Sequence, residues 1–329
     1  MANRIYGSIT DSTSNDAPIG GLRIQIWDSD WIGSDDFLGQ TSTSVDGHYE
    51  FQYSTGYLDE SMGIFRIDRP DLYITVENKN SAGQWVFLKK SEIYKNHNIN
   101  EDLKIDLSIE FGKPVIKRTD FIPAVNGFHF INSFVIKPDL LGIDFGTWNM
   151  GLCGGMCAGA LNRYTSGITT PDETEHPKSK TPLFSELVKR QVKSMVGKTL
   201  ALMLEWQRAP DITGSVRKKS IAQLTREQWN GLREALDNEI PTILVLIRTS
   251  GYLGNPTDNH QVLAVGYDYQ PATQEVSISF YDPNIPEETQ TLSMNIGLPG
   301  GILDLVDSSS SRTRGFFVNP QGEDAAGTI

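Results

Sequence analysis

The sequence contains only two cysteines, Cys153 and Cys157, and the first of them has the setting of a nucleophile. Glycines surround Cys153, and the small and apolar residues of segment 151–164 predict a helix that begins beside it. A cysteine in the first turn of a helix lies near unpaired backbone N–H groups and the positive end of the helix dipole. Both favour the reactive thiolate, and the same N–H groups can stabilise an oxyanion. Taken alone, the pattern is more typical of a small buried cysteine with a structural role.

Two further residues could complete such a site, because both lie at the ends of predicted strands. His260 directly precedes the apolar segment 261–269, and Asp282 directly follows segment 275–281. A Gln-Pro-Ala-Thr turn separates the two segments, which predicts a hairpin with His260 and Asp282 at the same end. A carboxylate there can fix the imidazole tautomer and support the imidazolium. A loop histidine without a role and a turn-forming Asp-Pro pair fit the same residues, and Asn284 is an alternative for the orienting role.

Taken together in chain order, these motifs resemble those of bacterial papain-like cysteine peptidases, including their C39-like branch. The shared residues are Cys153-Gly154-Gly155 at a helix start, the strand His260-Gln-Val-Leu-Ala-Val-Gly-Tyr, and Tyr281-Asp282-Pro-Asn. The resemblance covers roughly residues 120–318. It implies an α+β cysteine hydrolase domain in which Cys153 is the nucleophile, His260 the base and Asp282 the residue that orients the base.

The sequence departs from papain itself around the cysteines. Papain has Gln-Gly-x-Cys-Gly-Ser-Cys-Trp with the second cysteine catalytic, whereas here the second cysteine comes one residue later and no Gln precedes it. The form with Cys-Gly at the helix start fits better and implies Cys153. For the side chain that would stabilise the oxyanion we take Asn149, with Trp148 or Asn132 as alternatives.

The resemblance implies cleavage of an amide bond through an acyl-enzyme, without a required cofactor. The partner would be a protein or peptide substrate, or a cell-wall crosslink. The motifs do not separate a peptidase from an amidase, a transglutaminase-like enzyme or an acyltransferase. The alternative function is that of a binding protein with a catalytically inactive papain-like fold.

The first 112 residues predict a separate all-β domain. Segments 22–27, 49–53, 72–76 and 103–109 alternate apolar and polar residues, and turn signals such as Asp46-Gly47 separate them. This pattern is typical of a β-sandwich. A boundary near Gly112-Lys113-Pro114 therefore gives two domains, a β-sandwich over residues 1–112 and a cysteine hydrolase domain over residues 113–329.

The sandwich also carries an acidic loop. Asp28, Asp30 and Asp36 resemble the third calcium loop of C2 domains, and three carboxylates on one loop suit a hard cation such as calcium. The segments Pro18-Ile-Gly-Gly-Leu and Asp46-Gly-x-Tyr instead resemble transthyretin-like sandwiches, in which such a loop is an acidic turn without a metal.

Beyond residue 113, helical segments precede the strands. Segment 182–207 predicts one long amphipathic helix, and Thr225 with Gln228 three residues later has the capping-box spacing of a second helix. Segments 241–248 and 314–318 predict further strands, and the tail 319–329 is expected to be frayed. Helices followed by strands are typical of an α+β domain.

Composition excludes several classes of protein. The formal net charge of -12 disfavours binding to nucleic acid and to anionic membranes. No segment reaches the roughly 18 apolar residues of a membrane span. The first residues lack the apolar core of a secretory signal, which predicts synthesis in the cytoplasm and leaves export by a non-classical route open, as for an exported bacterial effector. The sequence does not determine the oligomeric state.

Overall fold

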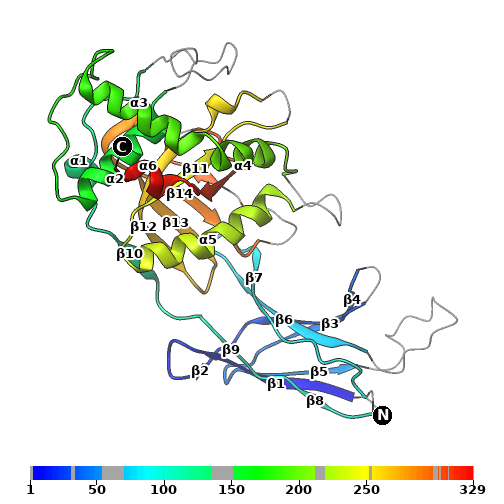
Figure 1. Cartoon of the computed structure of the whole chain (residues 1–329). Coiled ribbons are helices and arrows are strands. Elements are labelled where there is room, and N and C mark those ends of the chain that lie inside the picture. Colours follow the sequence, from blue (N-terminus) through cyan, green and yellow to red (C-terminus); the bar gives the residue numbers. More distant parts are fainter. Residues whose placement is uncertain are drawn as a thin grey trace. The chain divides into compact units, whose positions relative to one another are not determined.

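The computed structural model describes residues 3–30, 34–53, 70–98, 100–134, 151–211, 219–251, 254–298, 303, 305–309 and 311–328 (Figure 1). The chain divides into two compact units and consists largely of β-sheet, with several sheets and a group of helices. The first unit comprises Met1–Pro114, Gln270–Glu275 and Gly297–Pro299. The second comprises Val115–Tyr269, Val276–Ile296 and Gly300–Ile329, and contains all the helices of the described residues.

Two sheets form the first unit in the part of the chain that the structure describes. One sheet contains β1 (Asn3–Asp11), β2 (Ala17–Pro18), β5 (His48–Tyr53), β8 (Leu103–Lys104) and β9 (Leu107–Ile109). The other contains β3 (Arg23–Asp28), β4 (Asp36–Ser42), β6 (Leu72–Lys79) and β7 (Trp85–Lys90). Alternate residues of each sheet point into one shared core, for example Ile5 and Tyr49 from the first and Ile24 and Ile74 from the second. The arrangement is compatible with a β-sandwich.

The described residues of the second unit form a seven-stranded sheet. Its strands are β10 (Val115–Arg118), β11 (Thr242–Ile247), β12 (His260–Gln270), β13 (Glu275–Asp282), β14 (Ile285–Asn295), β15 (Val306–Asp307) and β16 (Gly315–Val318). The order is β15-β14-β13-β12-β11-β16, with β10 paired to the later part of β12. The predicted hairpin is present as β12 and β13, which are neighbours in this sheet.

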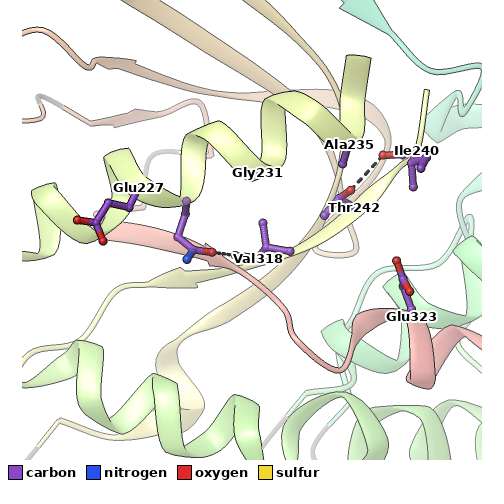
Figure 2. A pocket seen from close by; sticks show the side chains of 8 residues that line it. Glu227, Gly231, Ala235, Ile240, Thr242, Val318 and Glu323 are labelled. Atoms are coloured by element: carbon purple, nitrogen blue, oxygen red, sulfur yellow. Dashed lines mark hydrogen bonds between the residues drawn. The ribbon is translucent and has the colours of Figure 1, made fainter. Parts of the chain in front are cut away.

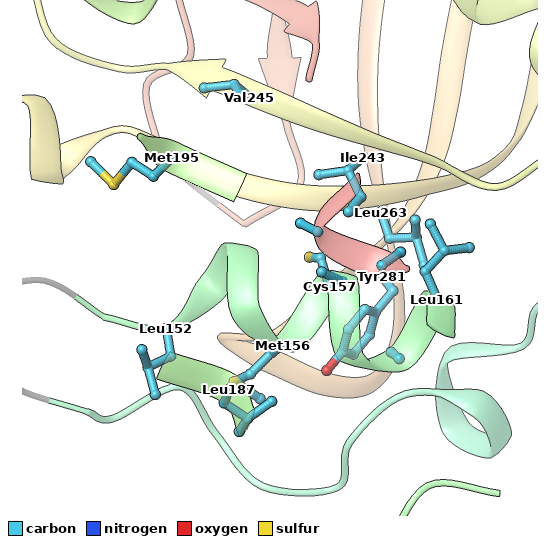
Figure 3. Close-up of a cluster of buried hydrophobic side chains, with 14 of the residues drawn as sticks. Leu152, Met156, Cys157, Leu161, Leu187, Met195, Ile243, Val245, Leu263 and Tyr281 are labelled. Atoms are coloured by element: carbon cyan, nitrogen blue, oxygen red, sulfur yellow. The ribbon is translucent and has the colours of Figure 1, made fainter. Parts of the chain in front are cut away.

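The second unit also contains helices. They are α1 (Pro123–Asn126), α2 (Cys153–Thr165), α3 (Pro182–Met195), α4 (Lys198–Gln207), α5 (Ile221–Asp237) and α6 (Gly322–Ala326), with a 3-10 turn at Pro256–Asp258. Residues of α2 and α3 pack on one face of the sheet, where Met156 and Leu187 share a buried cluster with Leu263 and Tyr281 (Figure 3). Successive side chains along a strand point to opposite faces of the sheet. The strand residues that alternate with those of the first cluster therefore pack in a second buried cluster on the opposite face.

Three predictions about this unit are wrong in detail: those for segment 182–207, for the start of α5 and for the C-terminal tail. Segment 182–207 forms two helices, because Val196 is extended and Gly197 has a φ of 90°, which ends the helical geometry. Helix α5 begins at Ile221, where Ser220 and Gln223 form a capping box, whereas Thr225 lies inside the helix and bonds to the carbonyl of Ile221.

The tail is likewise ordered rather than frayed. Ala325 and Ala326 in α6 are buried. Arg190 of α3 donates hydrogen bonds to the carbonyls of Ala325 and Gly327, at 2.7 and 3.0 Å. These bonds satisfy carbonyls at the helix end and tie the tail to α3.

The predicted strand 103–109 is also divided. It forms β8 and β9, each of which pairs with β1 in parallel. Between the two strands, the N–H of Ile105 bonds to the carbonyl of Tyr6, and its side chain is fully buried. The chain therefore stays beside β1 across the interruption.

Candidate active site

Cys153 is the first residue of α2, as the sequence predicts for a nucleophile. The N-cap residue Leu152 offers no side-chain cap, so the first N–H groups of the helix have few internal acceptors. Gln191 of α3 accepts the N–H of Gly155 through Oε1 at 2.8 Å. The N–H of Gly154 lies close enough to the thiol of Cys153 to lower its pKa. The helix start therefore supplies backbone donors at the position of the sulfur.

The two glycines after Cys153 are required by packing. A Cβ on Gly154 would overlap the side chains of Gln261 and Ser194, and a Cβ on Gly155 would overlap the backbone carbonyl of Leu187. The absence of side chains lets α2 approach β12 and α3 closely. That approach holds Cys153 against the start of the strand that carries His260.

We therefore expect Gly155→Ala to lower the free energy of unfolding by about 2 kcal/mol, because the backbone of α3 would have to move. Urea unfolding would measure the change. The matched control is Gly231→Ala in α5, where an added Cβ meets nothing within 4 Å. That variant should be more stable than the wild type by about 0.5–1 kcal/mol, because alanine favours a helix more than glycine does. Equal effects of the two substitutions would contradict the packing argument.

His260 and Asp282 form a short, buried pair. Nε2 of His260 lies 2.6 Å from Oδ1 of Asp282, and both side chains are almost completely buried. The same carboxylate oxygen accepts the N–H of Asn284 at 2.7 Å. Because Asp282 occupies Nε2, the other ring nitrogen of His260 is the one available to Cys153. The structure therefore brings Cys153, His260 and Asp282 together.

The pKa shifts describe an ion pair within this group. Burial raises the pKa of Cys153, but the hydrogen bond and charge of His260, with the N–H groups of Gln261 and Gly154, lower it below its ordinary value. Burial lowers the pKa of His260, and the hydrogen bonds to Asp282 and Cys153 outweigh burial and raise it to about 9. Both shifts favour the thiolate of Cys153 and the imidazolium of His260 over the neutral pair.

Cys157 does not share these properties. Its side chain is fully buried, and its Sγ donates to the carbonyl of Gln261 at 3.5 Å. Burial, followed by the neighbouring charge of Cys153, raises the pKa of Cys157 well above its ordinary value. Figure 3 shows Cys157 among the apolar side chains of the core beside α2. These are the properties of a buried structural cysteine.

The residue predicted to stabilise the oxyanion, Asn149, lies outside the described residues, as does Trp148. The third candidate, Asn132, is described and connects two parts of the site. Its Oδ1 accepts the N–H of Leu152 at 2.7 Å, and its Nδ2 donates to Oδ1 of Asn284 at 3.0 Å. Asn132 therefore joins the start of α2 to the turn that follows Asp282.

A narrow cavity adjoins Cys153 and His260. Its volume is about 20 Å³, which is enough for one water molecule. Met195, Met203 and Val245 contribute apolar wall, and Gln191 and Gln261 contribute amides. As far as the described residues line it, the cavity is thus a small recess beside Cys153 rather than a pocket for a large side chain.

A buried polar network beside this recess was missed by the sequence analysis. Gln261 donates to Oγ of Ser194 at 3.3 Å, and Asn319 donates to Oε1 of Gln261 at 2.8 Å and to the carbonyl of Ser194 at 2.9 Å. Thr199 in turn donates to Asn319 at 2.7 Å. The one signal available from the sequence was the polar residues Gln191 and Ser194 among the apolar positions of helix 182–195.

The predicted calcium ligands belong to the first unit. Asp28 accepts the N–H of Asp71 at 2.8 Å, and burial, together with the charges of nearby carboxylates including Asp30 and Asp36, raises its pKa to about 6. Among the residues that the structure describes, no group of three or more His, Cys, Asp or Glu side chains is arranged to bind a metal ion. Calcium binding by Asp28, Asp30 and Asp36 stays a prediction.

A separate groove of about 280 Å³ lies beside α5 and β16 (Figure 2). Gly231, Ala235, Ile240 and Val318 line it, with Glu227 and Glu323 as its charged groups. Gln228 accepts the N–H of Val318 at 3.0 Å, so the helix covers part of the strand edge. The groove lining contains no cysteine or histidine and shares no residue with the recess beside Cys153.

No helix in the described part of the chain is long and apolar enough to cross a membrane.

The chain matches no protein-family model and no curated protein. Two solved structures are similar over most of its length. A 9R-lipoxygenase from Cyanothece PCC8801 is 15% identical with a TM-score of 0.24, and the match covers 99% of this chain but only 43% of the lipoxygenase. A DUF3823 family protein from Bacteroides uniformis ATCC 8492 is 8% identical with a TM-score of 0.22, covering 93% of this chain and 96% of that protein.

Proposed function

We propose that the protein is a cysteine-dependent hydrolase that cleaves an amide bond, with Cys153 as nucleophile, His260 as acid and base and Asp282 as the orienting carboxylate. The observation that carries the proposal is the 2.6 Å contact of His260 with Asp282 in a buried pair whose histidine also hydrogen-bonds to Cys153. In this proposal the second unit is a papain-like α+β domain, and the first is a transthyretin- or C2-like sandwich that recruits a target.

The chemistry follows from the protonation states. The thiolate of Cys153 attacks the amide carbonyl carbon and forms a C–S bond, while the N–H groups at the start of α2 stabilise the oxyanion. The C–N bond then breaks, and the imidazolium of His260 gives its proton to the leaving amine. Neutral His260 next takes a proton from water, whose hydroxide attacks the acyl carbon. The C–S bond breaks, which releases the carboxylic acid and restores the thiolate–imidazolium pair.

Asp282 supports both half-reactions without taking up a proton. Its carboxylate fixes Nε2 of His260, so the other ring nitrogen faces the sulfur in every step. The small recess beside Cys153 can hold the single water that deacylation needs. These features favour hydrolysis over transfer to a second large substrate.

Incubation of the full-length protein with a pool of unrelated peptides tests the proposal. Mass spectrometry should detect new peptide termini with the wild type and a loss of at least a thousandfold in their rate of formation with Cys153→Ala. The thermal midpoint of the variant should stay close to that of the wild type. Peptide cleavage that persists in the variant would contradict the proposed nucleophile. A biological effect that Cys153→Ala leaves unchanged would favour the binding-protein alternative.

A further inference from the structure

The half-buried side chain of Asn132 connects the helix that carries Cys153 to the turn that follows Asp282. Its Oδ1 accepts the N–H of Leu152, the residue directly before Cys153, at 2.7 Å. Its Nδ2 donates to Oδ1 of Asn284 at 3.0 Å, and its backbone N–H donates to the carbonyl of Pro283 at 2.9 Å. Three bonds from one residue therefore join two parts of the site that lie far apart in the chain.

Asn284 is in turn bonded to the buried pair of His260 and Asp282. Its N–H donates to Oδ1 of Asp282 at 2.7 Å, and the same oxygen lies 2.6 Å from Nε2 of His260. A continuous path of hydrogen bonds thus runs from the N-cap of α2, through Asn132 and Asn284, to the carboxylate that holds the base. Movement of one end of this path relative to the other would change the separation of Cys153 and His260.

The orientation of both amides follows from one fixed donor. A backbone N–H can only donate, so the atom of Asn132 that faces Leu152 must be its oxygen. Nδ2 of Asn132 then faces Oδ1 of Asn284, and Nδ2 of Asn284 faces Nε2 of His260 at 3.4 Å. Asn284 therefore approaches the ring as a donor, and the ring proton goes to Asp282. Because its oxygen and its nitrogen are both bonded, Asn132 fits a positioning role better than that of an oxyanion donor.

Gly151 leaves the space that the amide of Asn132 occupies. A Cβ on Gly151 would lie 2.7 Å from Nδ2 and 3.0 Å from Oδ1 of Asn132. Both distances are well below the 3.5–4.0 Å or so at which non-bonded atoms pack best. The amide is short and bonded on both sides, so it cannot move aside without losing a bond. Glycine at this position, two residues before Cys153, therefore permits the contact.

We propose that Asn132 is a positioning residue that holds the start of α2, and with it the thiol of Cys153, beside the ring of His260. This inference rests on the function proposed above. A thiolate and an imidazolium stabilise each other only at short separation, because hydrogen bonds weaken steeply with misalignment and charge interactions weaken with distance. Leu152 offers no side-chain cap to the helix, and the amide of Asn132 binds its backbone from outside.

Replacing Asn132 tests position without changing charge. Asn132→Ala removes both amide bonds and leaves every ionisable group of the site in place. The groups that act on one another there are Cys153, Cys157, Arg248, His260 and Asp282. A looser contact should raise the titration midpoint of Cys153 and lower that of His260, each by roughly half a pH unit. The reason is that each group loses part of the stabilisation that the other provides.

Two measurements give these midpoints. The pH dependence of alkylation by iodoacetamide gives the midpoint of Cys153. NMR of the histidine rings gives that of His260, with His260→Ala to assign its signal among the five histidines. Because the removed side chain is neutral, opposite shifts of the two midpoints report a changed separation. A loss of stability alone would leave both midpoints of the folded protein unchanged.

Gly151→Ala disturbs the same amide without removing it. The added Cβ should displace the amide of Asn132 and shift both midpoints in the same directions as Asn132→Ala does. In the double variant the second substitution should add little, because the amide that the Cβ would meet is already absent. If Asn132→Ala fails to fold, the shifts in Gly151→Ala decide the question.

Asn126→Ala is the matched control. Oδ1 of Asn126 accepts the N–H of Ile122 at 2.8 Å, which is a bond of the same kind at α1 of the same unit. This variant should leave the midpoints of Cys153 and His260 unchanged. A shift as large as that of Asn132→Ala would contradict a specific role of Asn132.

Wild-type midpoints in folded Asn132→Ala would overturn the positioning role, even where Cys153 of the wild type is activated. Additive shifts in the double variant would also overturn it, because the Cβ would then act without the amide. Ordinary reactivity of Cys153 in the wild type would instead contradict the proposed hydrolase, and the positioning role with it. The two failures are therefore distinguishable.

Discussion

Alkylation of the native protein with a small haloacetamide is expected to label Cys153 at a rate that falls less than tenfold between pH 8 and pH 6. Over the same range an ordinary thiol loses reactivity roughly a hundredfold, because its thiolate fraction falls with pH. Cys153 should escape this loss because His260 and the start of α2 lower the pKa of its thiol. Mass spectrometry of the labelled peptide, with rates at several pH values, measures the effect.

Two comparisons within the protein make this experiment specific. Cys157 is fully buried with a raised pKa, so it should stay unlabelled in the native state and react only after unfolding. In His260→Ala, the rate at Cys153 should recover the steep pH dependence of an ordinary thiol. Slow labelling of both cysteines, independent of His260, would mean that the residues meet in the fold but do not form the proposed ion pair.

Replacing Asp282 by alanine is expected to affect both stability and chemistry. The substitution leaves His260 buried without its acceptor, which should reduce the free energy of unfolding by about 3 kcal/mol near pH 6. Any hydrolytic rate should fall about 10²- to 10⁴-fold, because the imidazole loses its orientation and the support for its charge. Urea unfolding and the peptide assay measure the two effects separately.

The pH dependence of that stability loss has a defined sign. His260 has its pKa raised to about 9, so the pair stabilises the folded state fully below the unfolded value of about 6.5 and loses this contribution as pH rises through 9. Asp282 has its pKa lowered, so its contribution is present above about pH 4 and is lost in more acidic solution. The difference between Asp282→Ala and the wild type should thus be largest between about pH 4 and 6.5.

Two further variants serve as controls for Asp282→Ala. Asp282→Asn retains an acceptor for His260 and should be less destabilised. Asp268→Ala removes a half-exposed ion pair with Arg118 on the same sheet and should cost about 1 kcal/mol or less. A stability loss in Asp282→Ala that is equal at pH 6 and pH 10 would contradict the assigned ionisation of the pair.

Some features of the fold could be predicted from the sequence because they depend on the local pattern of apolar and polar residues. The alternation in residues 22–27 and 72–76 predicts strands that are present as β3 and β6. His260 begins the first strand and Asp282 ends the second strand of a pair joined by a short turn, so a hairpin had to place them at the same end of a sheet. Cys153 precedes a run of helix-forming residues, and it is the first residue of α2.

Other features were wrongly predicted because they depend on distant contacts or on competing local signals. The helix over 182–207 is interrupted at Gly197, whose backbone the apolar periodicity does not reveal. The capping-box spacing occurs twice near the start of α5, at Ser220 and at Thr225. The helix begins after Ser220, and Ile221 and Ala222 are buried there. The tail forms a helix because Arg190, far away in sequence, binds its carbonyls.

The sequence by itself determined which residues could do chemistry and which segments form strands, because residue type and hydrophobic periodicity are local properties. It also placed the thiol at a helix start. Only the tertiary structure decided that Gln191 and Asn132 bond to the start of α2 and that Asp282 contacts the ring of His260. Those contacts join residues that are tens of positions apart, and electrostatic and packing forces act through space rather than along the chain.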